Sequence, residues 1–98
     1  MRKIFKYHSL HQFQEEAPNF KGLLVLSNGF FVDEKLIQML EDLEQDYYVI
    51  KYDNLEPNFL NFLKPDLGPN LFRFWNGQIT KKLTSLITED SLQTWLAE

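Results

Sequence analysis

The first half of the chain alternates between short apolar runs and one longer amphipathic stretch. Residues 4–7 predict a short strand, and Ser9 is a suitable N-cap for a helix over residues 10–16. The mostly apolar run from Gly22 to Ser27 has the length of a strand that is covered on both faces. From about Asp33, apolar residues recur at three- and four-residue intervals as far as Tyr47, which predicts an amphipathic helix.

The second half of the chain is richer in strand signals. Residues 47–52 are mostly β-branched and aromatic and predict a strand, which a short helix over residues 56–63 follows. After a loop with two prolines, residues 71–75 alternate as a strand. Asn76-Gly77 then predicts a tight hairpin, because a type I′ turn needs positive φ at both central residues. Residues 78–83 form the returning strand.

A last helix completes the pattern. Thr88 is a suitable N-cap, and Leu92, Trp95 and Leu96 lie on the apolar stripe that follows it, so Trp95 is expected in the core. The order βαβαβαββα predicts an α/β fold with a mixed central sheet and helices on both faces. The 98 residues suffice for a single domain, and nine Phe predict a core built largely of aromatic rings.

Charge and composition exclude several classes of partner. The net charge is -4, the pI is near 5.1 and the basic residues are scattered, so nucleic acid is not an expected partner. No apolar run has the length of a signal peptide or of a membrane span, so no membrane association is expected. The absence of cysteine favours a cytoplasmic location over a secreted one.

The chemistry-bearing residues are few. With no cysteine, the chain has no disulfide, no thiolate and no Cys-bound metal. His8 and His11 are three residues apart, but no third ligand lies near them in sequence. We find no Ser-His-Asp arrangement, no glycine-rich phosphate loop and no metalloprotease motif. The sequence therefore predicts no catalytic residue, no cofactor and no metal site.

The stretch from Gly68 to Gly77 supports a resemblance to a known family. It contains Pro69, an apolar strand and Asn76-Gly77, and thioredoxins have a similar run in which a cis-proline, a strand and Phe-Lys-Asn-Gly precede the second hairpin strand. The layout of elements from about Ile4 to Leu96 resembles a thioredoxin as well. The resemblance implies a thioredoxin-like fold over residues 1–98.

The turn between residues 27 and 36 departs from the thioredoxin pattern Trp-Cys-Gly-Pro-Cys-Lys. Phe30 takes the Trp position, Phe31 and Glu34 take the two Cys positions, and Lys35 matches the Lys. The family's buried acid on the preceding strand corresponds to Val25. The resemblance therefore implies a domain without thiol-disulfide activity.

The resemblance also points to a binding surface. In the family, the turn, the cis-proline loop and the loop after the last strand meet, and the backbone beside the proline pairs with extended peptides. Here the corresponding candidates for protein or peptide binding are Phe30, Phe31, Val32, Gly68, Pro69 and Ser85, with Leu86 beside them. Ser85 replaces a glycine that the family usually keeps. Two alternatives stay open: Phe30 and Phe31 fill the core, and Pro69 shapes a turn without contacting a partner.

Two further residues stand apart from the family pattern. Arg73 occupies a position that is apolar in the family and faces either a partner or a neighbouring carboxylate. Trp75 precedes the hairpin turn, where it either anchors an interface or packs across the hairpin.

These observations lead to one functional expectation and two alternatives. We expect a redox-inactive thioredoxin-like domain that binds a protein or peptide as a chaperone or assembly adaptor, and that is not an enzyme. The first alternative is a homodimer whose apolar surface closes on itself and has no other partner. The second is a glutathione-using enzyme without a thiol, for which Ser27 and Asn28 are the only polar residues just before the turn.

Overall fold

The computed structural model describes residues 1–85 and 87–98. Leu86, which the sequence assigns to the loop after the last strand, lies outside the described residues. The strands are β1 (Arg2–Ile4), β2 (Gly22–Ser27), β3 (Tyr47–Lys51), β4 (Asn70–Trp75) and β5 (Gln78–Thr84). The helices are α1 (Leu10–Glu16), α2 (Phe31–Asp42), α3 (Pro57–Leu63) and α4 (Glu89–Ala97), and a short 3-10 helix, η1, spans Tyr52–Asn54.

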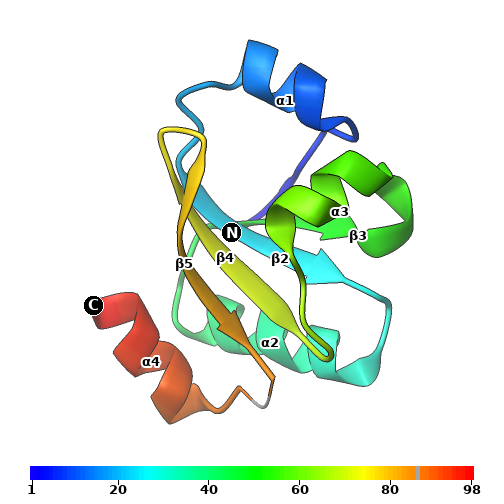
Figure 1. The fold of residues 1–98 in the computed structure, drawn as a ribbon. Coiled ribbons are helices and arrows are strands. Elements are labelled where there is room, and N and C mark those ends of the chain that lie inside the picture. Colours follow the sequence, from blue (N-terminus) through cyan, green and yellow to red (C-terminus); the bar gives the residue numbers. More distant parts are fainter. Residues whose placement is uncertain (86) are drawn as a thin grey trace.

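The strands form one five-stranded mixed sheet in the order β1-β3-β2-β4-β5. β1, β3 and β2 run parallel, whereas β4 pairs antiparallel with β2 and β5 pairs antiparallel with β4. Figure 1 shows α1 and α3 on one face of the sheet and α2 and α4 on the other. The predicted order of elements and an α/β fold with a mixed central sheet are thus confirmed.

The middle strand β2 contributes to a core on each side of the sheet. Leu23 and Val25 pack with buried residues of α2 and α4, and Leu24 and Leu26 pack with buried residues of α1 and α3. Successive side chains of a strand point to opposite faces, so an uninterrupted apolar run fits a strand that is covered on both sides. The prediction for residues 22–27 is therefore confirmed.

Aromatic rings fill the core under α1 and α3. The Phe13 ring is fully buried, and its centroid lies 5.3 Å from that of Phe59 and 5.6 Å from those of Phe5 and Phe20. Tilted and edge-on pairs of this kind add about 0.5–1.5 kcal/mol each beyond the area they bury. β1 begins at Arg2 and ends at Ile4, so both of its ends lie earlier than the sequence predicts. Phe5, which follows β1, still belongs to this core.

The ends of α2 also differ from the sequence prediction. The helix begins at Phe31, two residues before Asp33, and it ends at Asp42. Glu44, with φ at +56°, turns the chain, and the backbone nitrogen of Gln45 donates to the carbonyl of Leu40. Tyr47 lies in β3 and packs into the same core as the apolar face of α2. Its place in the sequence therefore continues the helical spacing although the helix has already ended.

The hairpin between β4 and β5 is tied to the segment that precedes β2. Asn76 and Gly77 have φ values of +50° and +73°, as the predicted turn requires. The backbone nitrogen of Gly77 donates to the carbonyl of Phe20. A Cβ atom at Gly77 would lie 2.8 Å from the carbonyl oxygen of Pro18, so the backbones approach more closely than any other residue type permits.

Arg73 and Lys81 hold the carboxyl end of α4 against the sheet. The Arg73 guanidinium donates to the carbonyls of Leu96 and Glu98, each at 3.1 Å, and lies 4.9 Å from the Trp95 ring centroid. The Lys81 amine donates to the carbonyl of Trp95 at 2.7 Å and forms an ion pair with the Glu98 carboxylate. Cations at this position also favour the negative end of the helix dipole. Trp95 is buried, as predicted.

Candidate functional site

The candidate site lies at the carboxyl ends of β2 and β3. The chain leaves β2 through Asn28 and Gly29 into α2, and it leaves β3 directly into η1. The loop before β4 and Ser85, after β5, reach the same region. In open α/β sheets, ligands bind in the crevice outside the carboxyl ends of the parallel strands. The fold therefore collects loops from four parts of the chain where ligands are usually found.

A buried carboxylate fixes the turn that leads into α2. Asp33 is fully buried, and its Oδ2 atom accepts hydrogen bonds from the backbone nitrogens of Asn28 at 2.9 Å and Phe30 at 3.2 Å. Its Oδ1 atom has no hydrogen-bond partner within the described residues. The backbone nitrogen of Gly29 donates to Ser27 Oγ. These bonds satisfy the amides of the turn just before the helix, including that of its N-cap Phe30, and hold the turn in place.

The turn presents apolar side chains to solvent. Phe30 is 63% exposed and Phe31 is 73% exposed, so the alternative in which they fill the core is wrong. Of the eight large apolar side chains exposed in the described residues, five lie in this region. We call these five the apolar patch: Phe30, Phe31, Val32, Tyr52 and Leu67. An exposed cluster of large apolar side chains of this kind often marks a contact site.

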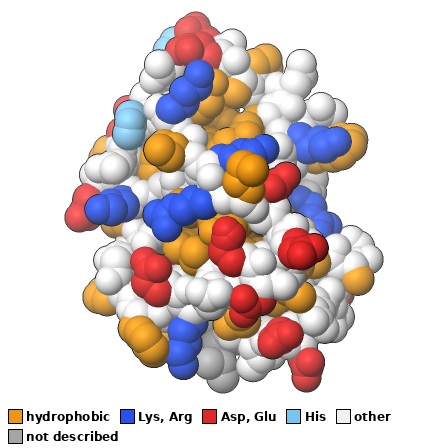
Figure 2. Space-filling view, turned by 180° about the vertical axis from the view of Figure 1, so that it is seen from behind, with side chains coloured by type: hydrophobic (Ala, Val, Ile, Leu, Met, Phe, Trp, Pro, Cys, Tyr) orange, Lys and Arg blue, Asp and Glu red, His pale blue; other side chains and the backbone are white. Residues whose placement is uncertain are grey.

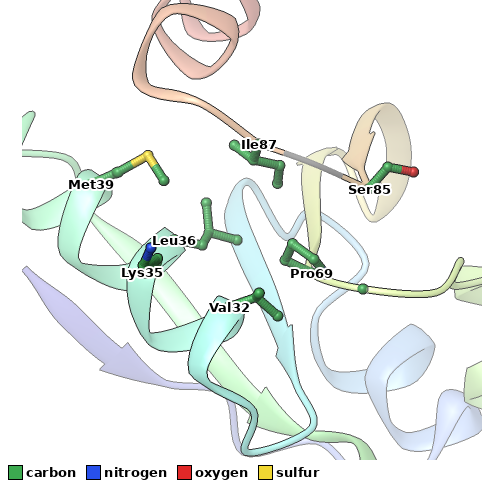
Figure 3. Close-up of a pocket in the computed structure, with 8 residues that line it drawn as sticks. Val32, Lys35, Leu36, Met39, Pro69, Ser85 and Ile87 are labelled. Carbon is green, nitrogen blue, oxygen red and sulfur yellow. The ribbon is translucent and has the colours of Figure 1, made fainter.

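Two hollows flank Gly68 within this region. The α2 hollow has a volume of about 420 Å³ and is lined by Val32, Lys35, Leu36, Met39, Gly68, Pro69, Ser85 and Ile87. In Figure 3 the α2 side chains Val32 and Leu36 face Pro69 and Ile87 across this space, and the Ser85 hydroxyl points away from it. The η1 hollow has a volume of about 500 Å³ and is lined by Asn28, Phe30, Tyr52, Pro65, Asp66, Leu67 and Gly68.

The structure brings most of the predicted candidates together. Val32, Gly68, Pro69 and Ser85 line the α2 hollow, and Phe30 lines the η1 hollow. Phe31 lines neither hollow, and its ring lies 5.0 Å from the Lys35 amine on the exposed surface of α2. Ser85, at the position of the family's glycine, has a φ of +69° and so keeps a backbone conformation that favours glycine.

The expected cis-proline is not present. The structure contains no cis peptide bond among its described residues, so the bond between Gly68 and Pro69 is trans. The loop is held by the buried side chain of Asn70, whose Nδ2 atom donates to the carbonyls of Asp66 and Gly68, each at 3.0 Å. The Gly68 carbonyl thus already accepts a hydrogen bond within the chain, and Pro69 has no N–H to donate. The argument for main-chain pairing beside Gly68 therefore loses its basis.

Sequence reasoning missed several residues of the region. Tyr52 was assigned to the end of a strand, although it begins η1 and is 38% exposed. Leu67 is 94% exposed, and the only signal for it was an apolar residue between turn-forming residues in the loop before Gly68. Met39 and Ile87 line the α2 hollow because α2 and the segment before α4 close it from two sides.

Charges around the apolar patch are mixed. Glu34 and Lys35 are both exposed on the first turns of α2, and neither forms an ion pair with another described residue. Asp66 accepts a hydrogen bond from the Thr84 hydroxyl at 3.0 Å. The acidic side chains Glu41, Asp42, Glu44 and Asp46 lie at the other end of α2 and in the turn after it. In Figure 2, acidic side chains gather in the lower half of the face shown, and basic ones lie across its middle.

Other kinds of site find little support. Among residues 1–85 and 87–98, no group of three or more His, Cys, Asp or Glu side chains is placed to hold a metal ion. His8 instead bonds to the carbonyl of Asn54, and His11 pairs with Glu15. Within the same residues, no helix has both the length and the apolar character needed to cross a bilayer.

What the region does offer is exposed apolar area beside two hollows, each of which has room for one or more apolar side chains. Of the polar groups near it, Asp33 and Asn70 are engaged within the chain, whereas Asn28, Lys35 and Asp66 are among the residues that line the hollows. Such an arrangement suits the burial of apolar side chains from another molecule. Compared with models of known protein families and with curated protein sequences, the chain matches none.

Proposed function

We propose that this chain is a redox-inactive, thioredoxin-like domain that binds a protein or peptide through the apolar patch and its two hollows. The observation that carries the proposal is the clustering of five exposed apolar side chains around these hollows. The bound segment supplies apolar side chains, and binding is driven by removing them and the patch from water. Burying one such side chain fully is worth about 1.5–3 kcal/mol.

The thioredoxin-like part of the proposal is supported by the arrangement of elements. Two parallel crossovers join β1, β2 and β3, and an antiparallel hairpin and a final helix follow. The turn between β2 and α2, where the resemblance puts the redox motif, carries Phe31 and Glu34. Neither side chain can take part in thiol-disulfide exchange.

The same surroundings give no support to an enzymatic role. Ser27, the hydroxyl just before the turn, is buried and accepts a hydrogen bond from the backbone of Gly29 at 3.2 Å. The Ser85 hydroxyl points away from the α2 hollow. We therefore propose a binding role without catalysis, and we keep the cytoplasmic location that the absence of cysteine favours.

Peptide binding tests this function directly. We would measure fluorescence anisotropy of labelled peptides that carry two Leu or Phe residues in a Ser- and Gly-rich background, and compare them with all-Ser versions of the same peptides. The apolar peptides are expected to bind wild-type protein, and Leu67→Ser is expected to weaken binding about tenfold. Ile4→Ser is the matched control, since Ile4 is 83% exposed on the edge strand β1. Equal binding of apolar and all-Ser peptides would refute the proposal.

A further inference from the structure

We infer that the partner at this surface is a second copy of the chain, bound as a symmetric dimer. The inference rests on the proposed function, because it uses the same apolar patch and names what covers it. In a two-fold interface the same surface occurs on both sides, so it must carry both the projecting side chains and the hollows that receive them.

The apolar patch meets this requirement. Leu67 and Phe31 are 94% and 73% exposed and so project from the surface. Leu67 lines the η1 hollow, of about 500 Å³, and Val32, the residue after Phe31, lines the α2 hollow, of about 420 Å³. Hollows of roughly 300–1,000 Å³ accommodate groups larger than a single leucine or phenylalanine side chain. A second copy therefore offers projecting apolar side chains that each hollow has room to receive.

The charges beside the apolar patch of one copy also complement those of a second copy. Glu34 and Lys35 are adjacent, exposed and of opposite sign, and neither has an ion-pair partner within the described chain. A two-fold axis near the start of α2 brings Glu34 of each copy close to Lys35 of the other. Opposite charges across an interface fix its register, and like charges there cost affinity.

The net charge of -4 opposes association only weakly at this surface. The acidic cluster Glu41, Asp42, Glu44 and Asp46 begins ten residues after the start of α2, which corresponds to about 15 Å along the helix. The screening length at physiological ionic strength is about 8 Å. Two copies that meet through the apolar patch thus keep their acidic clusters apart.

The size of the surface indicates how stable the dimer is. Three aromatic side chains, Leu67 and Val32, at their observed exposures, offer on the order of 500 Å² per copy. A standard stable interface buries about 800 Å² per partner, and smaller ones are typical of transient complexes. The dimer is therefore expected to dissociate in the micromolar range and to be visible only across a wide concentration series.

Sedimentation equilibrium from about 1 μM to about 1 mM tests the inference. Wild-type protein and Ile4→Ser are expected to shift from monomer to dimer, and Leu67→Ser to remain monomeric over most of the range. A wild type that is monomeric throughout overturns the inference, as does a dimer that Leu67→Ser leaves intact. If the wild type stays monomeric but binds apolar peptides through the apolar patch, the dimer fails and the proposed function stands. If neither occurs, both fail.

A charge exchange tests the geometry independently of the apolar side chains. Glu34→Lys and Lys35→Glu each place like charges across the two-fold axis and are expected to raise the dimer dissociation constant about tenfold. The double variant restores opposite charges and is expected to return close to wild-type affinity. Circular dichroism confirms that each variant is folded. A double variant that is no better than the singles would overturn this register.

Discussion

Asp33 Oδ2 accepts the backbone N–H of Phe30 at 3.2 Å, so a fully buried carboxylate holds the residue that opens the apolar patch. The same oxygen accepts the N–H of Asn28. Asp33, the third residue of α2, thus bonds back to the N-cap Phe30 and supports the surface that we propose for binding. Its hydrogen bond holds the backbone of Phe30, and it lines neither hollow itself.

Replacing Asp33 tests this support. Asp33→Ala removes the acceptor of two backbone hydrogen bonds at the start of α2 and is expected to lower the free energy of unfolding by about 2 kcal/mol. Urea denaturation followed by circular dichroism measures the change. Glu34→Ala, in the same turn but exposed, is the control and should cost less than about 0.5 kcal/mol. Equal losses for the two variants would contradict the capping role.

The contacts of Arg73 with the carboxyl end of α4 predict a loss of stability when they are removed. Arg73→Met keeps an apolar contact with Trp95 but removes two hydrogen bonds to the last carbonyls of the helix. The expected loss in the free energy of unfolding is about 1–2 kcal/mol. Lys21→Met is a matched control, because Lys21 also lies over a tryptophan ring, that of exposed Trp75. An Arg73→Met protein as stable as the Lys21→Met protein would show that the helix-end hydrogen bonds contribute little.

The end of α2 offers a route to higher stability. Glu44 has a φ of +56°, where glycine carries no steric penalty, and its negative charge lies at the unfavourable end of the helix dipole. Glu44→Gly is expected to raise the free energy of unfolding by about 0.5–1 kcal/mol. Glu44→Ala removes the charge and leaves the backbone cost, so the difference between the two variants in urea denaturation isolates the backbone term. A glycine variant less stable than the alanine variant would contradict the prediction.

Tyr47 predicts a dependence on alkaline pH. Burial raises the pKa of the Tyr47 phenol above its ordinary value of 10.0, and the negative charge of Glu41 raises this pKa further. The neutral phenol is therefore favoured in the folded state, and its contribution to stability is complete below the unfolded pKa. As pH rises through the folded pKa, that contribution is lost because the unfolded chain releases the proton more readily.

Unfolding in urea across an alkaline pH series measures this loss. Wild-type stability is expected to decline more steeply above about pH 10 than that of Tyr47→Phe, which has no phenol to titrate. The other tyrosines and the lysines are common to both proteins, so the difference in slope reports Tyr47. Parallel curves would mean that the Tyr47 pKa is the same in both states.

Local signals in the sequence were sufficient for most of the fold. Ser9 and Thr88 were predicted as N-caps, and their hydroxyls accept the backbone N–H of Gln12 and Ser91. Asn76-Gly77 specified its turn through backbone preference alone. The end of α2 was less clear, because a glutamate occupies the left-handed position at which glycine is the usual signal, and Tyr47 continues the apolar spacing from another element.

The candidate site was harder to predict because exposure is a property of the whole fold. Periodicity identifies residues that face a core, and it says nothing about Leu67 or Tyr52, which become neighbours only when two loops meet. The cis form that the family resemblance implied for the bond between Gly68 and Pro69 was wrong for a similar reason. Tertiary contacts select it, and here the side chain of Asn70 binds the loop on both sides of Leu67.

The contact between Gly77 and Pro18 has a practical consequence for work with this domain. The tips of β-hairpins are usually chosen for inserted tags, fluorophores or fused domains, because they are free on the surface. Here the tip is attached to the backbone before β2, with the Gly77 N–H bonded to Phe20 and no room for a side chain. An insertion at that tip would break the contact of Gly77 with the segment before β2, although β4 would stay paired with β2 along the ladder. Gly29 has open space around it, but it lies beside the apolar patch, so labels for binding studies belong on the exposed side of α1.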